Sequence, residues 1–141
     1  MSGADGASQY MVCLDGSEVS KNSLRLALRL LRPDDDSLLL LYWGYDIPND
    51  EVDAMARLVL NQSESYLAEA EKLARESGAK QVTTKAVLGF PRDQILLVAE
   101  EEGVEMIVMG ARGLSPIKKL LMGSVSSHVL SNAACPVLVV K

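Results

Sequence analysis

The chain has 141 residues, of which 48% are hydrophobic and 23% charged, and its formal net charge is −5. This size and balance are typical of a single globular domain rather than of a disordered or fibrous chain. Because the charge is negative and Lys and Arg form no cluster, the composition argues against binding to nucleic acids, whose affinity comes largely from phosphate neutralisation.

The first residues and the apolar runs indicate where the protein works. Residues 1–8 lack the basic and apolar regions of a secretory signal, and we expect them to be a disordered tail before one domain over 9–141. The longest apolar run, 38–43, is far below the ~20 residues that a membrane-spanning helix needs. Cys13 and Cys135 lie in apolar runs without CxxC spacing, which favours buried thiols in a reducing compartment. The sequence therefore favours a cytoplasmic protein with no membrane contact.

Short apolar runs alternate with stretches of helical periodicity along the chain. This alternation is typical of an α/β fold, in which helices cover a parallel sheet. The run at 38–43 is apolar on both strand faces, as a central parallel strand must be, whereas 81–88 alternates and is expected at an edge. Five strands are predicted, at 9–14, 38–43, 81–88, 106–109 and 136–140.

The segments between these strands carry apolar side chains at helical spacing. Asp15-Gly16-Ser17 is a turn-and-cap cluster before the first helix, Gly78 is expected to end the second, and Pro91 lies in the first turn of the third. A fourth helix is predicted at 124–133. The side chains expected to face the sheet are Leu24, Ala27, Leu28 and Leu31 in the first helix, Met55, Leu58, Val59, Tyr66, Ala70, Leu73 and Ala74 in the second, and Ile95, Val98 and Ala99 in the third.

A glycine-rich segment follows the fourth predicted strand. It reads Gly110-Ala111-Arg112-Gly113, then nine residues, then Gly123-Ser124-Val125-Ser126 at a helix start. Glycine lets the backbone approach a ligand closely, and unpaired N–H groups at a helix start attract anions. Ser124 and Ser126 add hydroxyl donors, and open parallel sheets bind ligands at the carboxyl ends of their strands. The segment predicts a phosphate site, although a tight turn followed by an ordinary N-cap also fits it.

Two common phosphate-binding motifs do not occur in the sequence. There is no GxxxxGK[ST] loop and no GxGxxG fingerprint, which disfavours P-loop and dinucleotide-binding proteins. Arg112, Lys118 and Lys119 are candidates to neutralise a phosphate chain, with solvated loop charges as the alternative.

The glycine spacing is part of a longer pattern. From Gly110 the chain reads glycine, two residues, glycine, nine residues, glycine-serine, and it closes on Cys135-Pro136-Val137-Leu138-Val139-Val140. Near the start it reads Val12-Cys13-Leu14-Asp15-Gly16-Ser17-Glu18. In both regions, and in the order of strands and helices between them, the chain resembles the universal stress protein family, and specifically its ATP-binding branch.

This resemblance implies a fold, a ligand and an assembly. The fold is an open, doubly wound five-stranded parallel sheet with strand order 3-2-1-4-5 and helices on both faces, so that Asp15 and Gly110 share one cleft. The ligand is ATP or another adenine nucleotide, with Mg²⁺ carried by the phosphates, and the assembly is a homodimer through the last strand. Carried over by position, the nucleotide-binding residues are Cys13, Asp15, Trp43, Met109, Gly110, Arg112, Gly113, Gly123, Ser124, Val125 and Ser126.

Two of these positions depart from the family's usual residues. Cys13 stands where many members have alanine or proline, and Trp43 stands where a small β-branched residue is usual. The indole either fills the adenine pocket and blocks it, or stacks on the purine, which is worth roughly 1–3 kcal/mol per base.

Three functions are compatible with this pattern. The first is a nucleotide-dependent regulatory or stress-response protein with at most slow ATP hydrolysis, because no base or water-positioning residue of the kind that phosphoryl transfer needs is evident. The second is an ATP-free dimeric interaction module with the pocket filled by Trp43. The third is a low-turnover ATPase or phosphotransferase that uses Arg112 and a serine such as Ser124 or Ser126.

The remaining candidate groups favour structural roles. His128 is the only histidine and has no accompanying nucleophile with an orienting carboxylate, so a surface or capping role is expected. Asp34, Asp35 and Asp36 are adjacent carboxylates without further ligand spacing, and we expect them to be solvent-exposed rather than a metal site.

Overall fold

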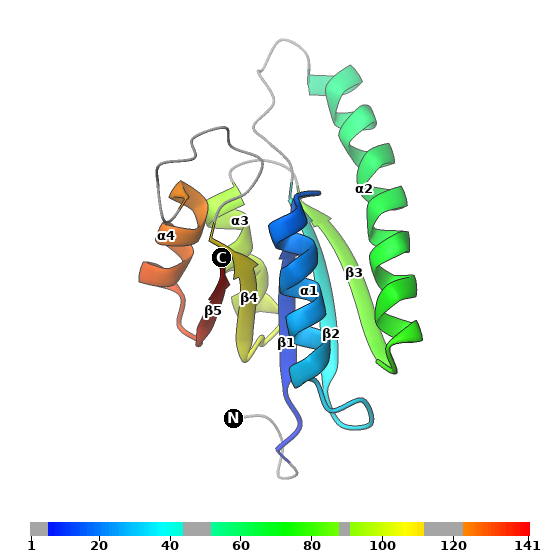
Figure 1. The fold of residues 1–141 in the computed structure, drawn as a ribbon. Helices are drawn as coiled ribbons and strands as arrows, with labels where there is room; N and C mark the ends of the chain where they lie inside the picture. Colours follow the sequence, from blue (N-terminus) through cyan, green and yellow to red (C-terminus); the bar gives the residue numbers. More distant parts are fainter. Residues whose placement is uncertain (1–5, 44–51, 88–90, 112–122) are drawn as a thin grey trace.

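A computed structural model describes residues 6–43, 52–87, 91–111 and 123–141, except for the side chains at 52–57, 59 and 60. Five strands alternate with four helices in the described chain (Figure 1). Their bounds are β1 (Gln9–Leu14), α1 (Glu18–Leu30), β2 (Ser37–Trp43), α2 (Val52–Glu76), β3 (Gln81–Val87), α3 (Pro91–Glu101), β4 (Met106–Gly110), α4 (Ser124–Asn132) and β5 (Val137–Val140).

The five strands form one parallel sheet in the order β3-β2-β1-β4-β5, which confirms the predicted topology. β1 is the central strand and pairs with β2 on one side and β4 on the other. β3 lies at an edge, as its alternating pattern predicted. Among the described helices none is long and apolar enough to cross a bilayer.

Each face of the sheet supports its own hydrophobic core. Helices α1 and α2 cover one face, and α3 and α4 cover the other (Figure 1). Because side chains alternate along a strand, β1 gives Val12 and Leu14 to the first core and Met11 and Cys13 to the second. Burial on both faces accounts for the continuous apolar runs of β1, β2 and β4.

The buried stripe of α2 differs from the one predicted. Its buried residues in the described part include Ser63, Leu67, Ala70 and Ala74. Leu58 and Leu73 were expected to face the sheet but are 54% and 37% exposed, so the prediction was wrong for both. The small side chains of Ala70 and Ala74 let the helix approach the sheet closely. Ser63 is also buried on this helix, although the apolar pattern of the sequence did not predict a buried residue there. The side chains of Met55 and Val59 lie outside the described set.

Gly78 ends α2 as predicted. Its φ is +105°, a left-handed conformation that glycine adopts without strain. Its N–H donates to the carbonyl of Arg75, and the N–H of Ala79 donates to the carbonyl of Ala74, which together form a Schellman motif. The chain is thereby turned from the helix into β3.

A buried carboxylate fastens the amino end of the sheet. Asp36 is 1% exposed, so the expectation that it is solvent-exposed was wrong. One carboxylate oxygen accepts from the Ser8 N–H and the Arg32 guanidinium, and the other accepts from the Arg32 N–H and Nε. Arg32 also donates to the Gly6 carbonyl. These bonds hold residues 6–8 against the α1–β2 turn, whereas residues 1–5 of the predicted tail lie outside the described chain.

We expect Asp36→Asn to lower the free energy of unfolding by about 1–3 kcal/mol at neutral pH, because the amide donates toward groups that are themselves donors. Burial would raise the pKa of Asp36, but hydrogen bonds from Arg32 and Ser8 outweigh it and lower the pKa below its usual value. The carboxylate therefore stabilises the fold fully above the unfolded-state pKa of about 4, and this stabilisation is lost as the pH falls through the lower folded-state pKa.

The measurement is denaturant unfolding of both proteins at several pH values. The difference between wild type and variant should narrow as the pH drops below about 4. Asp35→Asn is the matched control, since Asp35 is adjacent but exposed and should change little. An equal loss in both variants would contradict the assigned role.

Candidate functional site

The carboxyl ends of β1 and β4 lie at the topological switch point of the sheet, where the order of the strands along the sheet reverses its direction. From β1 the chain continues through α1 to β2 on one side, whereas β4 lies on the other side of β1. Ligands of open α/β sheets bind at such a switch point. Asp15 follows the last residue of β1, and Gly110 is the last residue of β4.

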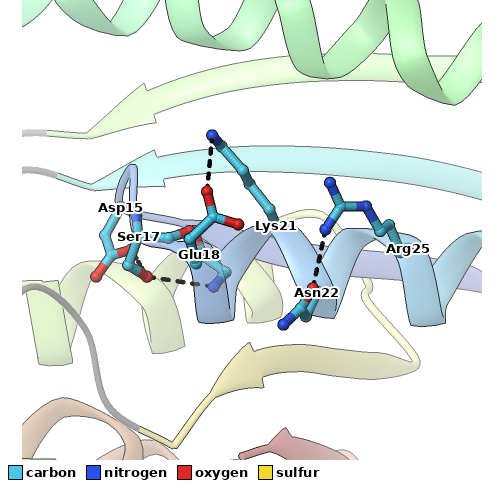
Figure 2. A network of polar contacts seen from close by, with 7 residues as sticks. Asp15, Ser17, Glu18, Lys21, Asn22 and Arg25 are labelled. Atoms are coloured by element: carbon cyan, nitrogen blue, oxygen red, sulfur yellow. Dashed lines mark hydrogen bonds and ion pairs between the residues drawn. The ribbon is translucent and has the colours of Figure 1, made fainter.

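Asp15 lies at this switch point and is held by one neighbour. It is 5% exposed, and its Oδ1 accepts two hydrogen bonds from Ser17, one from the hydroxyl at 2.6 Å and one from the backbone N–H at 2.9 Å (Figure 2). Its Oδ2 is buried, exposes less than 1 Å² and has no hydrogen-bond partner among the described residues. A buried acceptor without a partner is costly, so Oδ2 marks a place for a hydrogen-bond donor.

The start of α1 is less suited to an anion, because Ser17 caps it and Glu18 lies in its first turn. Ser17 is the N-cap, and its Oγ accepts from the N–H of Ser20 at 3.2 Å. Glu18 adds a negative charge in the first turn, which the helix dipole favours. Along the same helix Lys21 pairs with Glu18 and Arg25 bonds Asn22 (Figure 2). An anion would meet both an occupied cap and a carboxylate here.

The start of α4 has the opposite character. Its N-cap is Gly123, which has no side chain to cap the helix, and the first turn contains no acidic residue. The first intrahelical bond is that of Ser127 N–H to the Gly123 carbonyl, so the N–H groups of Ser124, Val125 and Ser126 have no acceptor within the helix. Such a helix start is suited to a phosphate group.

A single carbonyl joins the end of β4 to the start of α4. The Ala111 carbonyl accepts from the Gly123 N–H at 2.6 Å and from the buried Ser126 hydroxyl at 2.6 Å. Because a hydroxyl has one proton, Ser126 offers its backbone N–H rather than its Oγ to a ligand in this arrangement. Ser126 was predicted from the sequence but Ala111 was not, because a backbone acceptor leaves no trace in residue type.

The apolar residues predicted at the site belong to the hydrophobic core on the face of the sheet that α3 and α4 cover. Cys13 and Met109 are 2% exposed on neighbouring strands, and Val125 and Trp43 pack, partly buried, against the same core. Burial, and to a lesser extent the nearby Asp15 carboxylate, raises the pKa of the Cys13 thiol, which stays protonated. Cys135 is half-buried rather than buried as expected, and burial raises its pKa as well.

Several predicted residues fall outside the described chain. Arg112, Gly113, Lys118 and Lys119 belong to 112–122, for which no structure is described. Within the described ranges no group of three His, Cys, Asp or Glu side chains is placed to hold a metal ion.

The chain is similar to known proteins over nearly its whole length. The model of the universal stress protein family matches residues 9–141. The chain belongs to the universal stress protein family. It is similar to universal stress protein YxiE of Bacillus subtilis, with 32% identity over 94% of this chain and 98% of that one.

Solved structures of universal stress proteins share the fold. A universal stress protein solved in complex with cAMP is 26% identical, with a TM-score of 0.68 over 95% of this chain and 96% of that one. UspA from Lactobacillus plantarum, at 19% identity, covers 95% of this chain and 97% of that one with a TM-score of 0.84 and supports the fold alone.

His128 lies beside the candidate site and contacts α3. Its Nε2 is 3.7 Å from Oδ1 of Asp93, and Asn132 one turn on donates to the His128 carbonyl. The predicted surface or capping role agrees with its half-buried position on α4. Asp93 was not predicted as its partner, because the contact depends on how α3 and α4 pack.

We expect Ser126→Ala to loosen the junction between β4 and α4. The variant loses the bond from Oγ to the Ala111 carbonyl, which is worth about 1 kcal/mol. Amide hydrogen exchange should speed up at the N–H group of Gly123, which donates to the Ala111 carbonyl, relative to the N–H groups of β1. Ser127→Ala, at an exposed position of the same turn, is the control, and equal exchange in both variants would rule out the junction role.

Proposed function

We propose that this protein binds an adenine nucleotide, with ATP and phosphate-bound Mg²⁺ as its ligand, and acts as a nucleotide-dependent regulatory protein in the stress response. The observation that carries this proposal is the pairing of two unsatisfied groups across the switch point. One is the buried acceptor Oδ2 of Asp15, and the other is the uncapped start of α4.

The two groups suit opposite ends of a nucleotide. A carboxylate repels phosphate and accepts from N–H or O–H groups, so the nucleoside is proposed to lie at Asp15. Uncapped N–H groups attract phosphate, so the phosphate chain is proposed to lie at Ser124, Val125 and Ser126. Because Oδ2 exposes less than 1 Å², binding must move neighbouring atoms aside.

The other residues predicted from the sequence complete the proposed site. Trp43 ends β2 and is partly buried, so its indole would supply aromatic surface for the base, while Met109, one residue before the end of β4, lies in the core against which Trp43 packs. Gly110, Arg112 and Gly113 connect β4 to the phosphate end, where the guanidinium would neutralise charge.

Two further observations bear on ligand class and turnover. The 26% identical universal stress protein was solved with cAMP, which supports an adenine nucleotide here. Among the described residues near α4, His128 lies next to Asp93 and Asp15 is held by Ser17. Neither arrangement is that of a base poised on an attacking water, so at most slow hydrolysis is proposed.

Calorimetric titration with ATP, with and without Mg²⁺, tests the site. We expect wild-type binding and a loss of about tenfold or more in Gly123→Val, since a branched Cβ obstructs the approach of phosphate. The backbone at Gly123 has φ −78° and ψ 168°, which valine also adopts, so folding should survive.

Ser131→Val is the control, because it places the same branched side chain at an exposed position near the other end of α4. Its affinity should match that of wild type. Absence of ATP binding by wild type would reject the proposed function.

The proposal includes a homodimer through β5. This strand pairs only with β4 in the described sheet, and all four of its apolar residues are half-exposed. An apolar edge of this kind calls for pairing or cover.

Val139→Lys should shift the protein from dimer to monomer in light scattering, because a charge would enter the paired edge. Thr84→Lys, which adds the same charge to the exposed edge strand β3, is the control and should leave the mass unchanged. A wild-type protein that is monomeric at every concentration would contradict this part of the proposal.

A further inference from the structure

We propose that Ser17 is a positioning residue, which fixes Oδ1 of Asp15 so that Oδ2 accepts a hydrogen bond from a donor group of the bound nucleoside. This inference rests on the proposed function and specifies what its nucleoside end recognises. Ser17 is 8% exposed, and nothing in its sequence position marks it as more than a helix cap.

The hydrogen bonds of Ser17 leave its hydroxyl a single orientation. Oγ accepts from the N–H of Ser20, so its one proton is directed to Oδ1 of Asp15. The backbone N–H of Ser17 donates to the same oxygen. The Ser17 carbonyl accepts from the Ser20 hydroxyl at 2.8 Å and the Lys21 N–H at 3.2 Å, which holds the residue in place.

Both donors of Ser17 therefore bind one carboxylate oxygen and leave the other free. A carboxylate that was free to rotate would share these donors between its two oxygens. Held in this way, Asp15 presents a buried acceptor, Oδ2. A ligand group that cannot donate to this oxygen would leave it without a hydrogen bond, which weakens binding. The ligand group at Oδ2 must be an N–H or O–H donor, such as an exocyclic amine or a ribose hydroxyl, and a carbonyl or phosphate oxygen is excluded.

The hydrogen bonds from Ser17 also determine the effect of Asp15→Asn on the group that faces the nucleoside. Because both Ser17 donors need an acceptor, the amide oxygen takes the Oδ1 place and the NH₂ group takes the Oδ2 place. The substitution thus turns the acceptor facing the nucleoside into a donor, with little change of shape. ATP affinity should fall by about tenfold or more.

The test compares Ser17→Gly with Ser17→Thr, each titrated with Mg²⁺-ATP. Glycine and threonine are similar as N-caps, but only threonine keeps the hydroxyl that donates to Asp15. We expect Ser17→Gly to weaken binding about tenfold and Ser17→Thr to stay within about threefold of wild type. Thermal unfolding of each variant verifies that it is folded.

A second comparison separates positioning from simple support of the fold. Ser17→Gly is repeated in an Asp15→Asn background, where the group at the Oδ2 place is an NH₂ donor and no acceptor faces the nucleoside, and its effect there should shrink to within about twofold. Ser23→Ala is the matched control, since Ser23 is fully buried in α1 and its hydroxyl bonds only the Val19 carbonyl in the described chain. Its ATP affinity should equal that of wild type.

The possible outcomes distinguish the positioning role of Ser17 from the proposed binding of a nucleotide. Wild-type protein that binds no ATP overturns both. Binding that Ser17→Gly leaves unchanged, or weakens equally with and without Asp15→Asn, overturns the positioning role alone. A loss in Ser23→Ala as large as that in Ser17→Gly would also overturn it, because the effect would then come from helix stability.

Discussion

The parallel pairing of β1 with β2 on one edge and β4 on the other is the constraint on which the remaining structure depends. It places β1 at the centre of the sheet with residues 11–14 buried on both faces, so these side chains must be apolar until the strand ends. The first position free to be polar is Asp15, and there it lies beside the end of β4. The place of the candidate ligand site therefore follows from strand order, and few residues are needed to build it.

The two helix starts at the candidate site differ in polarity. Ser17 gives α1 a side-chain cap and ties that cap to Asp15, whereas Gly123 leaves α4 with free N–H groups. A nucleotide has the complementary division, with donors on the nucleoside and negative charge on the phosphates. Specific recognition would thus come from the orientation of the nucleotide, with its nucleoside at Asp15 and its phosphates at the start of α4. A large number of contacts would not be needed.

The strands and helices could be predicted from the sequence because the pattern that marks each of them is local. The apolar run of β2, the stripe of Leu24, Ala27 and Leu31, and the left-handed Gly78 each depend on neighbours along the chain. Strand order came from the family pattern, since residue periodicity alone does not specify which strands pair. The positions of Asp15, Gly110 and Gly123 around one place followed from that order.

What could not be predicted depends on contacts between distant segments. Asp36 looks like one of three equivalent loop aspartates, and it is distinguished by its hydrogen bonds from Arg32 and from Ser8, which lies 28 residues away. Leu58 and Leu73 fit an apolar stripe equally well on paper, but the helix turns its small residues to the sheet instead. The hydrogen bonds at Ala111 involve a backbone carbonyl, which every residue possesses. The closed junction at that carbonyl has a consequence for how such proteins diversify. Since β4 and α4 are fastened to each other at Ala111 and Gly123, the segment between them can change in length without moving either element. Doubling a loop costs only about 0.6 kcal/mol, so relatives can differ in the length of this connection while the sheet and its helices are preserved.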